Sequence, residues 1–207
     1  MKNTEWGAVA YLSHSKYGIN KDDVVAIFGG NFGKPQGLDF LLEVLKKYKN
    51  RENVKFILIG RGTEKKRIFS TIKEENYNNV FTYDFIPRRE YEKLTRSCDV
   101  GLIFLDKRFT IPNYPSKTLS YLECSLPIMA AIDKNTDYSE LLIEQNCGFW
   151  VENGDLEGFV ENFNRLIEDK ELRIKMGENG RKYFEKECDV EKSVKILEQY
   201  VKEYKNV

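Results

Sequence analysis

The chain has 207 residues, of which 41% are hydrophobic and 32% charged, and its 33 acidic side chains are balanced by 33 lysines and arginines. This length suffices for one well-buried core or two small ones. The balance of charge argues against a dedicated nucleic-acid-binding protein, because neutralising phosphates requires a basic surplus. No apolar run approaches the roughly 20 residues of a membrane-spanning helix, and the first residues do not resemble a signal peptide. We therefore expect a cytoplasmic globular protein.

The residues that most often bind metal ions are few and scattered. The four cysteines lack the spacing of metal ligands, which is typical of proteins kept in a reducing cytosol. With His14 as the one histidine, a His-rich metal site or a Ser-His-Asp triad has little material. We expect no metal site.

Short apolar runs bounded by glycine or proline alternate with helical patterns from about residue 24 to residue 187. This alternation is typical of an α/β protein whose parallel strands are buried on both sides. It predicts a Rossmann-like, doubly wound parallel sheet of about six strands with helices on both faces. The strands are expected at 24–28, 54–59, 80–83, 100–105, 127–132 and 148–151. The helices are expected at 38–48, 65–75, 89–97, 117–124, 138–145, 156–169, 170–187 and 190–205.

The two ends of the chain fit this pattern less well. Residues 1–22 form a weakly amphipathic lead-in, 23–187 form the sheet domain, and 188–207 carry an amphipathic helix after a break. Both end segments could pack on the sheet domain. They could instead contact a partner domain.

The first predicted loop, residues 29–37, contains four glycines and Lys34 between a strand and a helix. Glycine lets the backbone approach a ligand closely and expose successive N–H groups to an anion. The dipole of the following helix and Lys34 would add positive potential. The loop has neither the Gly-Lys-Ser/Thr of a Walker A motif nor the spacing of a dinucleotide-binding fingerprint. The alternative is an ordinary strand-to-helix turn.

A second candidate lies at the start of the predicted helix 117–124. Ser116 occupies the expected N-cap position and Lys117 the first turn. A cation at a helix N-terminus is unfavourable by up to about 1 kcal/mol, so a lysine there makes sense if an anion shares the site. The alternative is that Lys117 points into solvent. Gly60-Arg61-Gly62, taken by itself, is better explained as a tight turn.

In their order and spacing, these motifs resemble the C-terminal half of GT-B glycosyltransferases, nearest to family four and its enzymes of bacterial surface-polysaccharide assembly. The likeness covers essentially residues 17–187. It is carried by 24–39, 56–62, 98–102, 115–122, Pro127, Gly148 and 176–177. The resemblance implies two Rossmann-like domains, with the nucleotide-sugar donor bound by the C-terminal one and the acceptor by the N-terminal one. It also implies a retaining transfer that needs no metal, because basic side chains and helix N-termini stabilise the departing diphosphate.

The resemblance also assigns residues to parts of the donor. The phosphates would be bound by Gly30, Asn31, Gly33, Lys34, Ser116 and Lys117. The ribose and base would be bordered by Arg61, Ile86, Pro87, Ser120 and Glu123.

Three departures from the family pattern stand out. Many relatives carry an arginine and a lysine where this chain has Asn31 and Gln36, which leaves Lys34 to supply the charge. Many also carry two glutamates where this chain has Pro112 and Ser120, and Glu123 lies one turn beyond the second position. A complete enzyme of this kind is roughly twice as long as this chain.

We therefore expect the UDP-sugar-binding domain of a hexosyl- or N-acetylaminosugar transferase in polysaccharide or glycoconjugate biosynthesis, inactive by itself. Its partners would be the donor and a missing or separate acceptor domain, with peripheral contact to a lipid-linked acceptor at the inner face of the membrane. The alternatives are a non-catalytic interaction module, a degenerate GT-B half, or a nucleotide-sugar epimerase, for which no acid/base residues can be placed.

Overall fold

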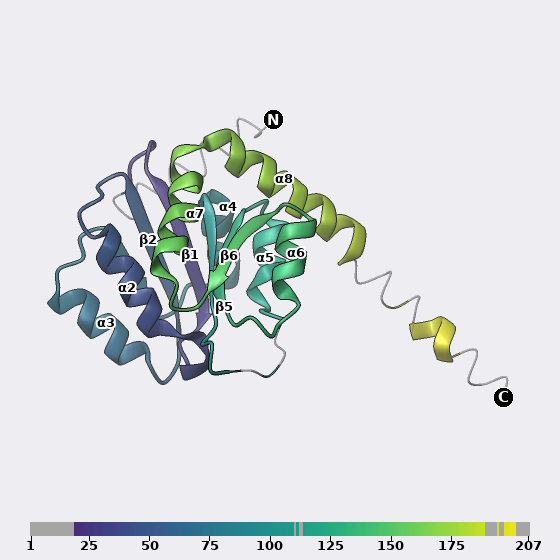
Figure 1. The fold of residues 1–207 in the computed structure, drawn as a ribbon, viewed down its shortest axis with the longest axis horizontal. Coiled ribbons are helices and arrows are strands. Elements are labelled where there is room, and N and C mark those ends of the chain that lie inside the picture. Colours follow the sequence, from purple (N-terminus) through teal and green to yellow (C-terminus); the bar gives the residue numbers. More distant parts are fainter. Residues whose placement is uncertain (1–18, 110, 112–113, 189–193, 195–196, 202–207) are drawn as a thin grey trace.

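The computed structural model describes residues 19–109, 111, 114–188, 194 and 197–201, and these form one twisted sheet with helices on both sides (Figure 1). The six strands are all parallel, in the order β3-β2-β1-β4-β5-β6. This confirms the predicted Rossmann-like α/β class. The strands are β1 (Val24–Asn31), β2 (Val54–Arg61), β3 (Val80–Tyr83), β4 (Val100–Phe104), β5 (Ile128–Ile132) and β6 (Gly148–Glu152).

The α-helices up to residue 187 agree with the predicted ranges to within one residue at each end. They are α2 (Leu38–Tyr48), α3 (Lys65–Glu74), α4 (Arg88–Ser97), α5 (Lys117–Glu123), α6 (Tyr138–Glu144), α7 (Leu156–Glu168) and α8 (Lys170–Glu187). The sequence did not predict the short 3-10 helix η1 (Lys34–Gln36), which lies between β1 and α2.

The helices divide between the two faces of the sheet. Buried side chains of α2, α3 and α7 pack on one face, and those of α4, α5 and α6 on the other. The first face is rich in aromatic rings, with Phe104 of β4 stacked on Phe159 of α7 at 5.7 Å between ring centres. Helix α8 contributes to both sides, since Met176 joins the first core while Tyr183 and Phe184 pack against the second.

β1 and β4 separate from each other before either strand ends. β1 pairs with β2 from Val24 to Asn31, but it pairs with β4 only at Ala26 and Ile27. The chain then leaves β1 toward α2 on one face and β4 toward α5 on the other. In open parallel sheets such a change of direction leaves a crevice beyond the carboxyl ends of the strands, where ligands bind.

The two end segments proposed from the sequence are only partly described. Residues 1–18 and most of the predicted helix 190–205 lie outside the described residues. Val194 and residues 197–201 are helical and follow the end of α8 in Figure 1. Their apolar side chains Val194, Leu197, Tyr200 and Val201 are exposed. The proposed domain boundaries therefore stay predictions.

Candidate functional site

A cavity of about 650 Å³ opens beyond the carboxyl ends of β1, β2 and β4, at the point where β1 and β4 separate. The first loop and the start of α5 both line it. Most of the residues that the resemblance assigned to the donor lie here. They are Gly30, Asn31, Arg61, Ile86, Ser116, Lys117 and Ser120.

Lys117 of α5 lines this cavity beside the first loop. Its Nζ donates a hydrogen bond to Oε1 of Gln36 over 2.9 Å and sits 4.0 Å from the centre of the Phe28 ring. Within the described part of the chain, no ion pair joins Lys117 to a carboxylate. Burial lowers the pKa of Lys117 to about 7, because removing the ammonium from water disfavours its charged form. The side chain therefore does not simply point into solvent.

The backbone of the first loop lies close to Lys117. Gly30 has a φ of +124°, a conformation that favours glycine, and a methyl group there would lie 3.8 Å from Lys117 Cε. Gly60 is paired with Gly30 in the sheet, and a methyl group at Gly60 would lie 1.8 Å from the Gly30 carbonyl oxygen. The glycine at position 60 thus lets β1 and β2 run together to the cavity and bring Arg61 to its edge.

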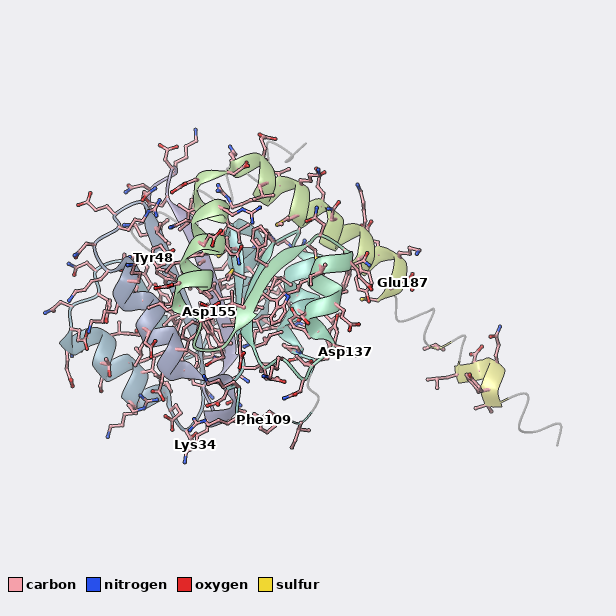
Figure 2. The ribbon with its side chains drawn as sticks, in the orientation of Figure 1. Lys34, Tyr48, Phe109, Asp137, Asp155 and Glu187 are labelled. Carbon is pink, nitrogen blue, oxygen red and sulfur yellow. The ribbon has the colours of Figure 1, made fainter. Side chains whose placement is uncertain are left out.

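Four of the predicted donor residues do not line the cavity. Lys34 begins η1 and is exposed, and Figure 2 shows it at the periphery of the molecule. Gly33 is buried beside the Asn31 side chain, and Pro87 is the exposed N-cap of α4. Glu123 forms an ion pair with Arg96 at 3.0 Å and its carbonyl accepts a hydrogen bond from Arg181. Glu123 therefore ties α5 to α4 and α8, and its contact with ribose stays a prediction.

Ser116 differs from the simple capping residue that the sequence predicted. It occupies the N-cap position of α5, but its side chain makes no capping hydrogen bond. The residue is exposed and lines the cavity. Pro112, the other position of the missing glutamate pair, lies outside the described residues.

The cavity also has side chains that were not assigned to it from the sequence, among them Gln36 and Tyr91. Gln36 was noted only as a departure from the family pattern, and no local pattern indicated its contact with Lys117. Tyr91 of α4 packs over the end of β1, and a methyl group at Gly29 would lie 2.1 Å from its Oη. One tyrosine in a mostly charged helix gave no signal of this position either.

The edge of the cavity near β3 combines a cation with an exposed ring. The Arg61 guanidinium carbon lies 5.4 Å from the centre of the Phe85 ring, and Phe85 is 66% exposed. Ile86 beside it is buried. Such an edge suits a flat, partly apolar group, because an aromatic ring and a guanidinium both stack well on planar groups.

The sequence matches the family described as Glycosyl transferases group 1 over residues 12–183. The chain belongs to this family. One relative is the capsular polysaccharide biosynthesis glycosyltransferase CapM of Staphylococcus aureus, with 24% identity over 84% of this chain and 44% of the relative. The chain thus spans less than half the length of this relative.

Solved structures of glycosyltransferases share the fold. The C-terminal domain of the glycosyl transferase group 1 family protein LpcC from Francisella tularensis superposes with a TM-score of 0.70 and 18% identity, over 87% of this chain and 93% of that one. HepE from Anabaena, in complex with UDP-glucose, superposes with a TM-score of 0.75 and 20% identity, over 97% of this chain and 53% of HepE. The sheet domain therefore has the fold of one half of a GT-B glycosyltransferase.

Two further findings concern membrane-spanning helices and metal sites, neither of which was expected from the sequence. Over the described ranges, no helix is both long and apolar enough to cross a bilayer. Within the same ranges, no group of three or more histidine, cysteine, aspartate or glutamate side chains is arranged to hold a metal ion.

Proposed function

We propose that this domain binds the nucleotide-sugar donor of a glycosyltransferase and that the diphosphate lies between the first loop and the start of α5. The observation that supports this most strongly is Lys117, a part-buried ammonium with a neutral amide and an aromatic face as neighbours. A bound diphosphate would supply the opposite charge. The UDP-glucose complex of HepE, a protein of the same fold, favours a UDP-sugar.

The arrangement suits the departure of a nucleoside diphosphate. When the bond between the anomeric carbon and the diphosphate breaks, its electron pair and the negative charge move to the leaving phosphate. The ammonium of Lys117 and the backbone N–H groups near Gly30 and Asn31 would stabilise that charge, with Ser116 as a further donor. We propose a retaining transfer of a hexosyl or N-acetylaminosugar group in which no metal takes part.

The remaining parts of the donor would lie toward β2 and β3. Ser120 is on the same side of α5 as Ser116 and Lys117, close enough in sequence to reach the ribose that follows the phosphates. The base would rest on the backbone near Ile86, with Arg61 and Phe85 at its open side.

The acceptor would be bound by a second domain. This chain covers 44% of CapM and 53% of HepE, so each of those chains is long enough to contain a second domain of similar size. We propose that catalysis requires that half, either as another part of a longer chain or as a separate subunit. CapM acts in capsular polysaccharide biosynthesis by its name, and we propose a related role in the assembly of a polysaccharide or glycoconjugate at the inner face of the membrane.

A calorimetric titration of the purified chain with UDP, GDP, ADP and uridine tests the proposal. We expect saturable binding of UDP, weaker binding of uridine, and no change when EDTA is present. Binding of GDP or ADP in place of UDP would keep the donor site and change the donor. If none of the nucleotides binds, the donor site is refuted for this chain and a non-catalytic interaction module becomes the better hypothesis.

A further inference from the structure

Gln36 is held firmly in place by the backbone around it. Its own N–H donates to the carbonyl of Gly33 over 3.0 Å, which closes η1. The neighbouring carbonyl of Pro35 accepts a hydrogen bond from the N–H of Asp106 over 2.9 Å, which ties η1 to the end of β4. The amide side chain therefore extends toward Lys117 from a rigid support.

The contact between Gln36 and Lys117 has a particular chemical character. An amide oxygen accepts one N–H of the ammonium, carries no net charge, and leaves the other N–H groups free for a ligand. A carboxylate at the same place would form an ion pair and compete with an anionic ligand. A second ammonium would repel the first.

We propose that Gln36 is a positioning residue for Lys117: its amide holds the ammonium over the Phe28 ring, directed at the anion, without neutralising its charge. The identity of that anion as a nucleoside diphosphate rests on the function proposed above. Many relatives have a lysine at the position of Gln36. In this chain Gln36 instead orients Lys117, which supplies the positive charge for the anion.

The other ionisable groups around Lys117 do not replace this contact. η1 contributes the exposed Lys34, and β2 contributes Arg61, which stacks on Phe85. From the remaining elements, Asp84 pairs with Lys65, Asp106 pairs with Arg108, and Tyr91 and Tyr114 line the cavity with hydroxyl groups whose pKa values burial raises. The lowered pKa of Lys117 has burial as its cause and no resolved contribution from these groups.

An NMR pH titration of the Lys117 side chain tests the inference without any nucleotide. The full chain is labelled with carbon-13 at lysine Cε, and the resonance of Lys117 is identified by its loss in Lys117→Arg. In Gln36→Glu we expect the pKa of Lys117 to rise by about one unit or more, because a carboxylate favours the charged form. In Gln36→Met we expect it to fall, because the hydrogen bond to the charged form is lost. Gln199→Glu, an equal change at an exposed helical position, should leave it unaltered.

Titrations with UDP and uridine complete the test. Gln36→Glu should weaken UDP binding at pH 6 by about tenfold or more, because its carboxylate neutralises Lys117, and leave uridine binding as in the wild type. Unchanged Lys117 pKa values in both Gln36 variants would overturn the inference even if UDP binds. Equal losses of UDP and uridine would also overturn it, since they would indicate a merely structural role. Opposite pKa shifts in a chain that binds no UDP would uphold the coupling of Gln36 to Lys117 and refute the proposed donor site.

Discussion

The hydroxyl group of Tyr121 donates a hydrogen bond to the carbonyl oxygen of Ile27 over 3.0 Å, at the residue where β1 stops pairing with β4. The carbonyl oxygen of Leu102 on β4 lies 3.3 Å from the same hydroxyl, and the N–H of Gly29 donates to it over 3.4 Å. One fully buried side chain of α5 thus satisfies backbone groups that the separating strands leave without a sheet partner. Because Lys117 lies one turn earlier on α5, this contact also fixes one wall of the cavity.

Replacing Tyr121 with phenylalanine should therefore destabilise the domain. The ring stays, but the carbonyl of Ile27 and the N–H of Gly29 lose a partner where water does not reach. We expect the free energy of unfolding to fall by about 1–3 kcal/mol. Urea unfolding followed by circular dichroism measures it, with Tyr200→Phe at an exposed position as the control. A Tyr121→Phe variant as stable as the control would mean that water can satisfy these groups.

Replacing Lys117 with alanine should weaken UDP binding by about 1.5–3 kcal/mol, the range for hydrogen bonds to charged groups. Uridine, which has no phosphate, should bind as before. Calorimetry with both ligands measures the difference, and Lys46→Ala on the exposed side of α2 is the control. Unchanged affinity for UDP would remove Lys117 from the phosphate site.

The affinity for UDP should depend on pH through Lys117. Burial lowers its pKa to about 7 in the chain without ligand, so the ammonium loses its proton as the pH rises through that value. A bound diphosphate favours the charged form, and binding should therefore take up a proton and weaken from pH 6 to pH 9. In Lys117→Arg the guanidinium stays charged throughout, and the affinity should change little over this range. Identical pH profiles in the two proteins would contradict this prediction.

The same ionisation should affect stability with the opposite sign. Between about pH 7 and the ordinary lysine value of 10.5, the unfolded chain binds a proton at Lys117 that the folded chain does not. The free energy of unfolding therefore increases as the pH rises over this window. Subtracting the values for Lys117→Met removes the contributions of other groups, and the difference should rise with pH.

The sequence could predict the sheet and its helices because these depend on local patterns. Strands such as Val54–Arg61 are built on a short apolar run, here Phe56–Ile59, and helices such as Leu38–Tyr48 repeat their apolar positions every three or four residues. The sequence also directed attention to the loops after the carboxyl ends of the strands, and several of these loops line the cavity.

The details of the site depend on contacts between distant residues, which no local pattern encodes. Lys34 lies in a glycine-rich loop and was expected to supply the charge, but the turn of η1 leaves it exposed. Lys117 is held in the cavity by a hydrogen bond to Gln36, which is 81 residues away in the sequence. No local pattern could predict that contact. The role of Tyr121 likewise depends on the divergence of β1 and β4, which is a property of the assembled sheet.

Lys34 offers a direct comparison of the two lysines. From the sequence, Lys34 was expected to supply the charge that binds the phosphates. Since Lys34 is exposed and outside the cavity lining, its charge is screened by salt, and we now expect an effect on UDP binding of less than about threefold at physiological salt. A loss as large as that of Lys117→Ala would show that η1 turns toward the ligand when it binds.

The ring of Tyr121 should leave no space for a side chain larger than that of glycine at position 101. A methyl group on Gly101 would lie 2.4 Å from Cδ2 of Tyr121, and both residues are fully enclosed. We expect Gly101→Ala to lower the free energy of unfolding by about 1–3 kcal/mol, as overpacking of a core does. In a Tyr121→Ala background, where the ring is gone, the same change should cost much less. The coupling in this double-mutant cycle, measured by urea unfolding, reports how tightly α5 is held against β4. If the two changes are additive, the close approach of Tyr121 to Gly101 does not set the position of α5, and the argument that Tyr121 fixes this wall of the cavity is lost.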